Sequence, residues 1–188
     1  MKTLMLKMLA AASVAALTFT HTAAAGAAAQ TGQPAPDFTL TDLAGRTQRL
    51  ADYKGRIVVL EWVNPECPFV MKHYESGNMP AMQKAAVADG VVWITINSGH
   101  AGAQGDYAPG KAKAWLEEKG AAPTAYCRDQ DGRVGRLYGA KTTPHMFVID
   151  TRGKLVYDGA IDSIRSASKA DIAKAENYVL SALAALKA

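Results

Sequence analysis

Long apolar runs without a polar face predict buried strands in this chain. Two of them, RIVVLEWV at 56–63 and VVWITIN at 91–97, are rich in β-branched residues, as parallel strands covered on both faces are. Shorter apolar runs predict three further strands at 123–127, 145–150 and 154–161. The last two flank the turn sequence TRG, so we expect them to form a hairpin.

Between these strands the apolar residues recur at helical spacing. The pattern predicts a helix from Cys67 with a break at Gly77, a helix over 111–120, and a final helix that begins near Ser168 with Asp171 as its capping partner. The final helix would bury a stripe of apolar residues, Ile172, Val179, Leu183 and Leu186. Strands that alternate with helices predict an α/β fold, with a mixed central sheet and helices on both faces.

The first 29 residues have the layout of a secretory signal peptide. Lys2 and Lys7 are the only lysine, arginine, aspartate or glutamate residues in this segment. An apolar run is followed by small residues that allow cleavage after Ala25 or Ala29. A membrane anchor is the alternative, but the run is short and alanine-rich and no charged stop-transfer residues follow it. We therefore expect residues 1–29 to be removed, residues 30–188 to form one domain, and the mature protein to be periplasmic or extracellular.

Charge and cysteine content narrow the function classes. The chain has 21 basic and 17 acidic residues, and loss of the two leader lysines leaves 19 against 17, which is too weak and scattered to indicate a nucleic acid or a membrane surface as partner. Both cysteines, Cys67 and Cys127, lie in the mature part. In an oxidising compartment they could form a disulfide, or one could be a reactive thiol and the other a buried bystander.

Cys67 lies at the junction between a buried strand and a helix. Unpaired N–H groups and the helix macrodipole favour a thiolate there, and Lys72 and His73 could add positive potential. Glu66 opposes this, because a like charge beside a thiolate disfavours it. Pro68 suits a first helical turn, where its missing N–H costs nothing. The alternative is that Cys67 is a small buried core residue.

Several motifs together resemble the thioredoxin superfamily. They are the Cys-Pro helix start, INS after the next strand, YGA followed by TP, and FVID followed by GKLVYDG. The chain is most similar to the exported redoxin or peroxiredoxin-like branch, related to the alkyl hydroperoxide reductase/thiol-specific antioxidant proteins, over residues 33–165. This resemblance implies a thioredoxin-like fold and an antioxidant or thiol–disulfide oxidoreductase activity that needs no cofactor or metal.

The resemblance also implies roles for individual residues. Cys67 falls on the attacking cysteine, and Val70 stands where thioredoxins carry the resolving cysteine. Thr143 precedes Pro144, which falls on the cis-proline whose backbone faces a bound substrate, and Pro68 adjoins the same site. Glu61 matches a buried carboxylate that exchanges a proton with a thiol.

Alternatives remain open at two of these positions. Glu61 could instead be a partly solvated carboxylate at the end of the strand, or one paired with Lys72 or Arg56. Cys127 could resolve an oxidised Cys67, or it could be a packed strand residue far from it.

The chain departs from true peroxiredoxins around the cysteine. Leu60 stands in place of a proline, Asn64 in place of a threonine or serine, and His145 lies where a segment carries an arginine. The hydroxyl and guanidinium bind the peroxide and stabilise its leaving oxygen, so these changes disfavour efficient peroxidase activity, although Asn64 could still donate a hydrogen bond.

The favoured hypothesis is an exported thiol oxidoreductase. Cys67 attacks a disulfide or hydroperoxide, and an external protein or low-molecular-weight thiol, or Cys127, resolves the product. One alternative is a non-catalytic binding module that uses the glycine-rich segment 98–110 or the neighbourhood of His145. Another is a copper-binding protein whose ligands would come from a sulfur-rich set, Cys67, Met71, His73, Met79 and Met82.

Overall fold

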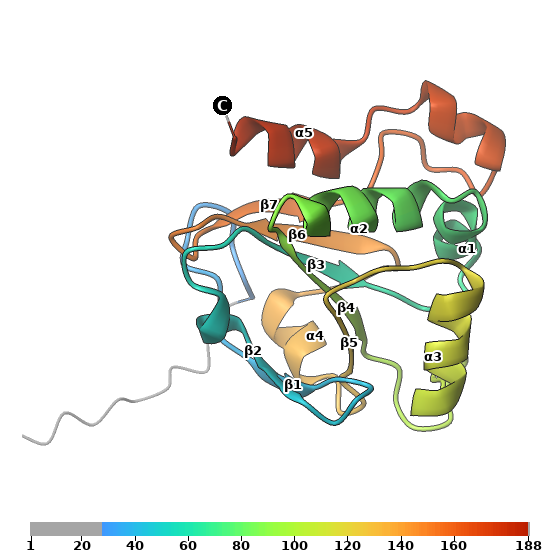
Figure 1. The fold of residues 1–188 in the computed structure, drawn as a ribbon, viewed down its shortest axis with the longest axis horizontal. Helices are drawn as coiled ribbons and strands as arrows, with labels where there is room; N and C mark the ends of the chain where they lie inside the picture. The colour runs from blue at the N-terminus through green and yellow to red at the C-terminus, as the bar shows by residue number, and fades with distance from the viewer. Residues whose placement is uncertain (1–27, 188) are drawn as a thin grey trace, which may run out of the picture.

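A five-stranded mixed sheet forms the centre of the computed structural model, which describes residues 28–187 (Figure 1). Its strand order is β5-β4-β3-β6-β7, with β3, β4 and β5 parallel and β6 antiparallel to both of its neighbours. The strands are β3 (Val58–Trp62), β4 (Val92–Asn97), β5 (Ala125–Arg128), β6 (His145–Ile149) and β7 (Leu155–Gly159). All five predicted strands and the predicted hairpin are confirmed.

The two faces of the sheet are covered by different elements, because alternate residues of each strand point to opposite faces. Val59 and Val63 of the central strand region pack into one hydrophobic cluster, and Leu60 and Trp62 pack into the other. The first cluster receives α1 (Pro68–Glu75), α2 (Asn78–Ala88), α3 (Pro109–Glu118) and α5 (Tyr178–Ala185). The second receives α4 (Arg133–Tyr138), the β1 (Thr39–Thr41)–β2 (Thr47–Arg49) hairpin and the 3₁₀ turn η1 (Leu50–Tyr53). Helices on both faces were predicted.

Gly77 makes the predicted break between α1 and α2. Its φ of 77° lies in the left-handed region, which glycine adopts without the steric cost of a Cβ. The chain can therefore turn sharply and start a second helix that packs on the same face. No helix within residues 28–187 is long and apolar enough to cross a membrane.

The prediction of one final helix from Ser168 is wrong. The segment divides into a 3₁₀ turn, η2 (Lys169–Lys174), and α5, with extended backbone between them. Asn177 forms a bridge with Asp162 in that extended stretch, and its side chain accepts the backbone N–H of Leu180 as the cap of α5. Ser168 makes no side-chain cap bond. The cap at Asn177 therefore replaces the one expected at Ser168.

The signal-peptide prediction falls on residues 1–29, nearly all of which lie outside the described residues. Ala29 is within them, and its N–H bonds to the carbonyl of Leu137. The chain is therefore hydrogen-bonded to the rest of the domain from Ala29 onward.

Candidate active site

Cys67 occupies the N-cap position of α1, just beyond the carboxyl end of β3. Pro68 follows as the first helical residue and is exposed. A residue before proline is driven into extended backbone, and Cys67 accordingly has φ −74° and ψ 125°. Its carbonyl accepts the N–H groups of Val70 and Met71, which starts the helix, and the residue is partly exposed.

The predicted cis-proline bend lies against this cysteine. The Thr143–Pro144 peptide bond is cis, and the thiol of Cys67 donates to the Thr143 carbonyl at 3.1 Å. The sheet register explains the contact, because Trp62 at the end of β3 pairs with His145 at the start of β6. The bend before β6 and the cysteine after β3 therefore meet at the same edge of the sheet.

Asn64 holds the turn that leads to Cys67. Its side-chain oxygen accepts the N–H of Glu66 at 2.9 Å, and its backbone carbonyl accepts the N–H of Cys67 at 3.0 Å. Its amide nitrogen donates to the carbonyl of Gln104 at 3.3 Å. The side chain that was predicted as a hydrogen-bond donor at the site is thus engaged in shaping the turn.

The glycine-rich segment 98–110 is fastened to this turn and to β5. Asp106 accepts from Arg128 at 2.6 Å, from Gln130 at 2.9 Å and from the N–H of Gly102 at 3.1 Å. These bonds hold the pKa of Asp106 below its usual value, although burial opposes them. The loop therefore has a fixed shape next to Asn64, which sequence reasoning did not foresee.

Gly105 makes the closest approach between this loop and Asn64. Its φ is +76°, and a Cβ there would lie 1.9 Å from the Asn64 side-chain oxygen. We expect Gly105→Ala to lower the free energy of unfolding by about 1–3 kcal/mol and to change the rate at which iodoacetamide alkylates Cys67, because Asn64 must move. Gly102→Ala is the matched control, since φ is +79° and nothing lies within 4 Å of its added Cβ. Equal alkylation rates in the two variants would contradict this coupling.

Glu61 is the centre of a buried hydrogen-bond network. It is fully buried and accepts from the hydroxyl of Tyr74 at 2.7 Å, Trp93 Nε1 at 2.8 Å, Gln83 Nε2 at 3.0 Å and Thr95 Oγ1 at 3.1 Å. Loss of hydration raises the pKa of Glu61, and these four donors oppose the rise. Glu61 is therefore buried, as the resemblance to thioredoxins predicts. Its hydrogen-bond partners connect β3 to α1, α2 and β4.

The alternative pairing of Glu61 with Lys72 or Arg56 is wrong. Arg56 donates instead to the carbonyl of Gly90. Lys72 is buried and forms an ion pair of 2.9 Å with Asp162, 90 residues further along the chain. Both predicted cationic partners are thus engaged elsewhere.

Lys72 and His73 also do not supply the free positive potential expected near Cys67. Asp162 neutralises the charge of Lys72 and lies 3.4 Å from His73 Nε2. The amide of Asn78 lies 2.8 Å from His73 Nδ1, which must accept from it, so the ring proton is on Nε2 and faces Asp162. Burial lowers the pKa of His73 to about 4 and keeps the ring neutral at pH 7.

His73 should make the protein less stable in mild acid. Its pKa is about 4 in the folded state against about 6.5 when unfolded, so the unfolded chain binds more protons between these values. The contribution of neutral His73 to the free energy of unfolding is therefore complete above about pH 6.5 and is lost as the pH falls toward 4. Urea unfolding of wild type and His73→Gln should therefore show a stability difference that shrinks over this range. His100→Gln, at an exposed position, is the control; pH curves that stay parallel for His73→Gln would refute the assignment.

Cys127 does not lie with Cys67, so the structure contradicts its predicted role as resolving thiol. Both thiols are free, and Cys127 is fully buried in β5 within the cluster that contains Leu60 and Trp62. Cys67 packs against the cluster on the other face of the sheet. Burial, with a smaller effect of Asp42, raises the pKa of the Cys127 thiol to about 12, which makes it a poor nucleophile.

The sulfur-rich set proposed for copper is also not gathered into one site. Met79 and Met82 are buried core residues, whereas Met71 is exposed and Cys67 is partly exposed. Within residues 28–187, no group of three or more His, Cys, Asp and Glu side chains could hold a metal ion.

Two pockets adjoin the Cys67–Thr143 contact and share Thr142 and Thr143. The first, here called the apolar pocket, has a volume of about 350 Å³ and lies between α1 and residues 160–166. The second, here called the amide pocket, has a volume of about 290 Å³ and lies between the ends of β3 and β4, the loop 98–105 and residues 140–143. Sequence reasoning missed most of their lining residues, notably Phe69, Ile164, Arg165, Gln104 and Lys141. Phe69 carried a usable signal, because it is a large apolar residue on the exposed side of α1.

Comparison with known proteins shows the family to which this chain belongs. A model of the AhpC/TSA family matches residues 31–158. The chain belongs to the AhpC/TSA family. Thiol-disulfide oxidoreductase ResA of Geobacillus thermodenitrificans is 31% identical over 131 residues, which are 66% of this chain and 66% of that protein. The chain thus spans slightly less than two thirds of this relative's length.

Solved structures confirm the thioredoxin-like fold of this AhpC/TSA protein. A conserved protein from Geobacillus kaustophilus has a TM-score of 0.65 and 30% identity, covering 72% of this chain and 71% of that one. A putative thiol:disulfide interchange protein DsbE from Chlorobium tepidum has a TM-score of 0.60 and 28% identity, covering 83% and 99%. The pneumococcal exposed lipoprotein thioredoxin Etrx1 from Streptococcus pneumoniae strain TIGR4 has a TM-score of 0.54 and 28% identity, covering 70% and 93%.

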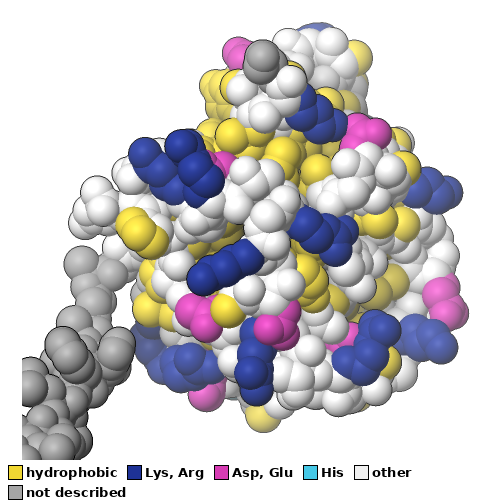
Figure 2. Space-filling model, turned by 60° about the vertical axis from the view of Figure 1, so that its left-hand side comes forward, with side chains coloured by type: hydrophobic (Ala, Val, Ile, Leu, Met, Phe, Trp, Pro, Cys, Tyr) yellow, Lys and Arg dark blue, Asp and Glu magenta, His cyan; other side chains and the backbone are white. Residues whose placement is uncertain are grey.

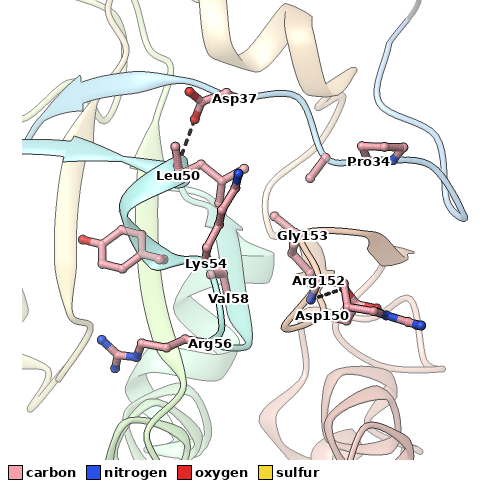
Figure 3. Close-up of a pocket in the computed structure, with 13 residues that line it drawn as sticks. Pro34, Asp37, Leu50, Lys54, Arg56, Val58, Asp150, Arg152 and Gly153 are labelled. Atoms are coloured by element: carbon pink, nitrogen blue, oxygen red, sulfur yellow. Dashed lines mark hydrogen bonds and ion pairs between the residues drawn. The ribbon is translucent and has the colours of Figure 1, made fainter.

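The AhpC/TSA chain has a further pocket of about 340 Å³ at the opposite end of β3 from Cys67 (Figure 3). Three cationic residues line it, Lys54, Arg56 and Arg152; Arg152 pairs with Asp150, and Arg56 bonds to the carbonyl of Gly90. The lining residues include no cysteine, so this pocket lacks the thiol that is present at the other end of β3. In Figure 2, which turns this side of the molecule forward, lysine and arginine side chains are interspersed with acidic and uncharged ones.

Proposed function

We propose that this protein is a thiol oxidoreductase in which Cys67 attacks disulfides. The observation that carries the proposal is the partly exposed Cys67 sulfur at the start of α1, 3.1 Å from the carbonyl that precedes the cis-proline. A thiol in this position is accessible to a substrate and has unpaired N–H groups of the helix beside it. The printed names of ResA and the DsbE protein support the same class of reaction.

The reaction runs through a mixed disulfide. The Cys67 thiolate attacks one sulfur of the substrate disulfide, forms a new S–S bond and releases the other substrate sulfur as a thiolate. In the resting thiol the proton is shared with the Thr143 carbonyl, and this bond is lost when the thiolate forms. An external thiol then resolves the intermediate, since Val70 and Cys127 are both buried and Cys127 packs on the other face of the sheet.

The remaining predicted residues support Cys67 in this scheme. Thr143 and Pro144 present backbone to the substrate chain beside the sulfur, and Pro68 contributes exposed surface next to it. Asn64 is a positioning residue, because it fixes the turn before Cys67. Glu61 is a second positioning residue, since it ties α1 to the central strand through Tyr74 and retains its proton more readily than an exposed glutamate.

A disulfide fits the site better than a hydroperoxide. The positions that carry peroxide-binding groups in peroxidases hold Leu60, which is fully buried in the core, and Asn64, whose amide bonds to the loop. His145 is paired with Asp158 at 2.7 Å. These residues therefore provide neither the hydroxyl nor the guanidinium that would stabilise a leaving oxygen.

We also propose that residues 1–29 are a cleaved signal peptide, that residues 30–188 form the mature domain, and that the protein works outside the cytoplasm. The lysine-flanked apolar run supports this, as does the similarity to a thioredoxin described as an exposed lipoprotein. N-terminal sequencing of the protein recovered from its producing cells should begin near residue 26 or 30. A mature protein that begins at Met1 would contradict the proposal.

Trapping of the intermediate tests the enzymatic function. Reduced protein mixed with 2,2′-dithiodipyridine or a cystine peptide should form a mixed disulfide at Cys67, located by peptide mass mapping. Hydrogen peroxide at the same concentration should oxidise Cys67 much more slowly. A native protein whose Cys67 forms no adduct with any disulfide would favour the non-catalytic binding module instead.

A further inference from the structure

The amide pocket next to Cys67 has a lining unlike that of the apolar pocket. Its side chains include the amides of Asn64, Asn97 and Gln104, and its single charged residue is Lys141. The lining contains no acidic residue. Within residues 28–187, no hydrogen bond engages the side chain of Lys141 or of Gln104, so both are available to a ligand.

Hydrogen bonds between residues distant in the sequence hold the walls of the amide pocket in place. Asn97 is buried, and its amide donates to the carbonyl of Gly105 at 2.8 Å, which fastens the loop across the pocket. Asp106 fastens the same loop to β5 through Arg128. Nearby Asp129 is buried and does not line the pocket, and its carboxylate accepts from Ser98 at 2.6 Å and from two N–H groups of α4. The wall is therefore held in place before any ligand arrives, as in most small-molecule sites.

We propose that the amide pocket receives the thiol that resolves Cys67, and that this thiol is a small molecule carrying a carboxylate. The inference rests on the proposed function, because it concerns the second half of the same reaction. Lys141 provides a cation for the carboxylate, and the side-chain amide of Gln104 provides a donor and an acceptor for a polar backbone, whereas the amides of Asn64 and Asn97 hold the walls. The pocket volume of about 290 Å³ suits a molecule of a few amino-acid units rather than a protein surface.

The position of the pocket fits the chemistry of resolution. A thiolate attacks a disulfide sulfur in line with the bond that it breaks, so the incoming and leaving sulfurs lie on opposite sides of Cys67 Sγ. The two pockets meet at Thr142 and Thr143, and the Thr143 carbonyl contacts that sulfur. The proposal accordingly assigns the substrate half to the apolar pocket and the small thiol to the amide pocket, which reach the Thr143 bend from different elements.

Resolution consists of two thiol–disulfide exchanges. The small thiolate forms an S–S bond to Cys67, and the bond to the substrate sulfur breaks, so the substrate leaves as a thiolate that takes up a proton. A second small thiol then attacks the new mixed disulfide, which releases the Cys67 thiolate and the oxidised small disulfide. Two small thiols are oxidised for each substrate disulfide that is reduced.

The test uses the full mature protein loaded at Cys67 with a neutral leaving group. Reaction with 2,2′-dithiodipyridine gives the pyridyl mixed disulfide, and release of pyridine-2-thione reports its attack by added thiol. The probes are 3-mercaptopropionate, 2-mercaptoethanol and cysteamine, which are anionic, neutral and cationic. Each rate is divided by the rate of the same thiol with a small pyridyl disulfide, which removes intrinsic differences in reactivity.

We expect the order anion, neutral, cation in the wild type. The ratio of anionic to neutral rates should fall about threefold to fivefold in Lys141→Gln, as for loss of an exposed ion pair, and should fall similarly in high salt. Lys54→Gln, an exposed lysine at the other end of β3, should keep the wild-type ratio. Equal ratios in wild type and Lys141→Gln would overturn the pocket assignment while leaving the proposed function intact. Failure of Cys67 to form the pyridyl adduct would overturn both.

Discussion

Cys67→Ser should abolish disulfide reduction, with a rate lower than that of wild type by at least about 10³-fold in an insulin-reduction assay. A serine hydroxyl at neutral pH is far less nucleophilic than a thiolate and forms no stable bond to sulfur. Because the helix start and the cis-proline bend do not depend on the sulfur atom, the variant should fold normally. Circular dichroism and urea unfolding would check this.

Cys127→Ala is the matched control for that experiment. Cys127 is fully buried on the other face of the sheet, and burial raises its pKa to about 12. Its replacement should leave the rate within about twofold, at a stability cost of about 1–2 kcal/mol for the small cavity. Thiol titration of the native wild type should detect one fast thiol, and the second only after unfolding. A Cys127→Ala variant as inactive as Cys67→Ser would restore the resolving role.

Glu61→Leu should lower the free energy of unfolding by at least about 4 kcal/mol. The leucine removes the shared acceptor of four donors, those of Tyr74, Trp93, Gln83 and Thr95, and each buried donor left unpaired costs about 1–3 kcal/mol. Glu61→Gln keeps an acceptor oxygen of the same shape and should cost about 1–2 kcal/mol. Urea unfolding at pH 7 measures both values. A leucine variant as stable as the glutamine variant would show that the network contributes little.

The pH dependence of the stability of Glu61→Gln is a second test of the network around Glu61. The pKa of Glu61 is raised in the folded state, so the folded protein binds more protons than the unfolded chain above about pH 4.5. This contribution is complete at low pH and is lost as the pH rises through the folded-state value. The stability of wild type relative to Glu61→Gln should therefore decrease with rising pH. An increase would mean that the four donors outweigh the loss of hydration.

Local sequence signals were sufficient for the strands, whereas the cis-proline that faces Cys67 was predicted from the resemblance to the thioredoxin superfamily. The apolar run at 56–63 had no polar face and became the central strand, and Pro68 marked the helix start. In the structure the bend before β6 lies beside the exit of the central strand because β6 pairs with β3. These features depend on neighbouring residues or on one strand pairing.

Contacts between distant residues could not be read from the sequence. Lys72 and His73 lie four and five residues after Pro68 in the sequence, yet their environment is set by Asp162, 90 residues from Lys72. The face on which Cys127 lies depends on the register of β5 against β4, where it pairs with Ile96. The final helix was misread because its apolar spacing continues across Asn177, whereas the bridge to Asp162 interrupts it. In each case a long-range partner outweighed the local pattern.

Part of the wall of the apolar pocket lies outside the segment that matches the AhpC/TSA family. Residues 160–166 lie beyond residue 158, where the match to the family ends, and they are held by Lys72 through Asp162 and by Glu176 through Ser163. This wall is therefore tied to the helix that begins beside Cys67. A substitution at Asp162 would leave the buried Lys72 ammonium of α1 unpaired, so changes that alter the substrate side also disturb the support of the reactive sulfur.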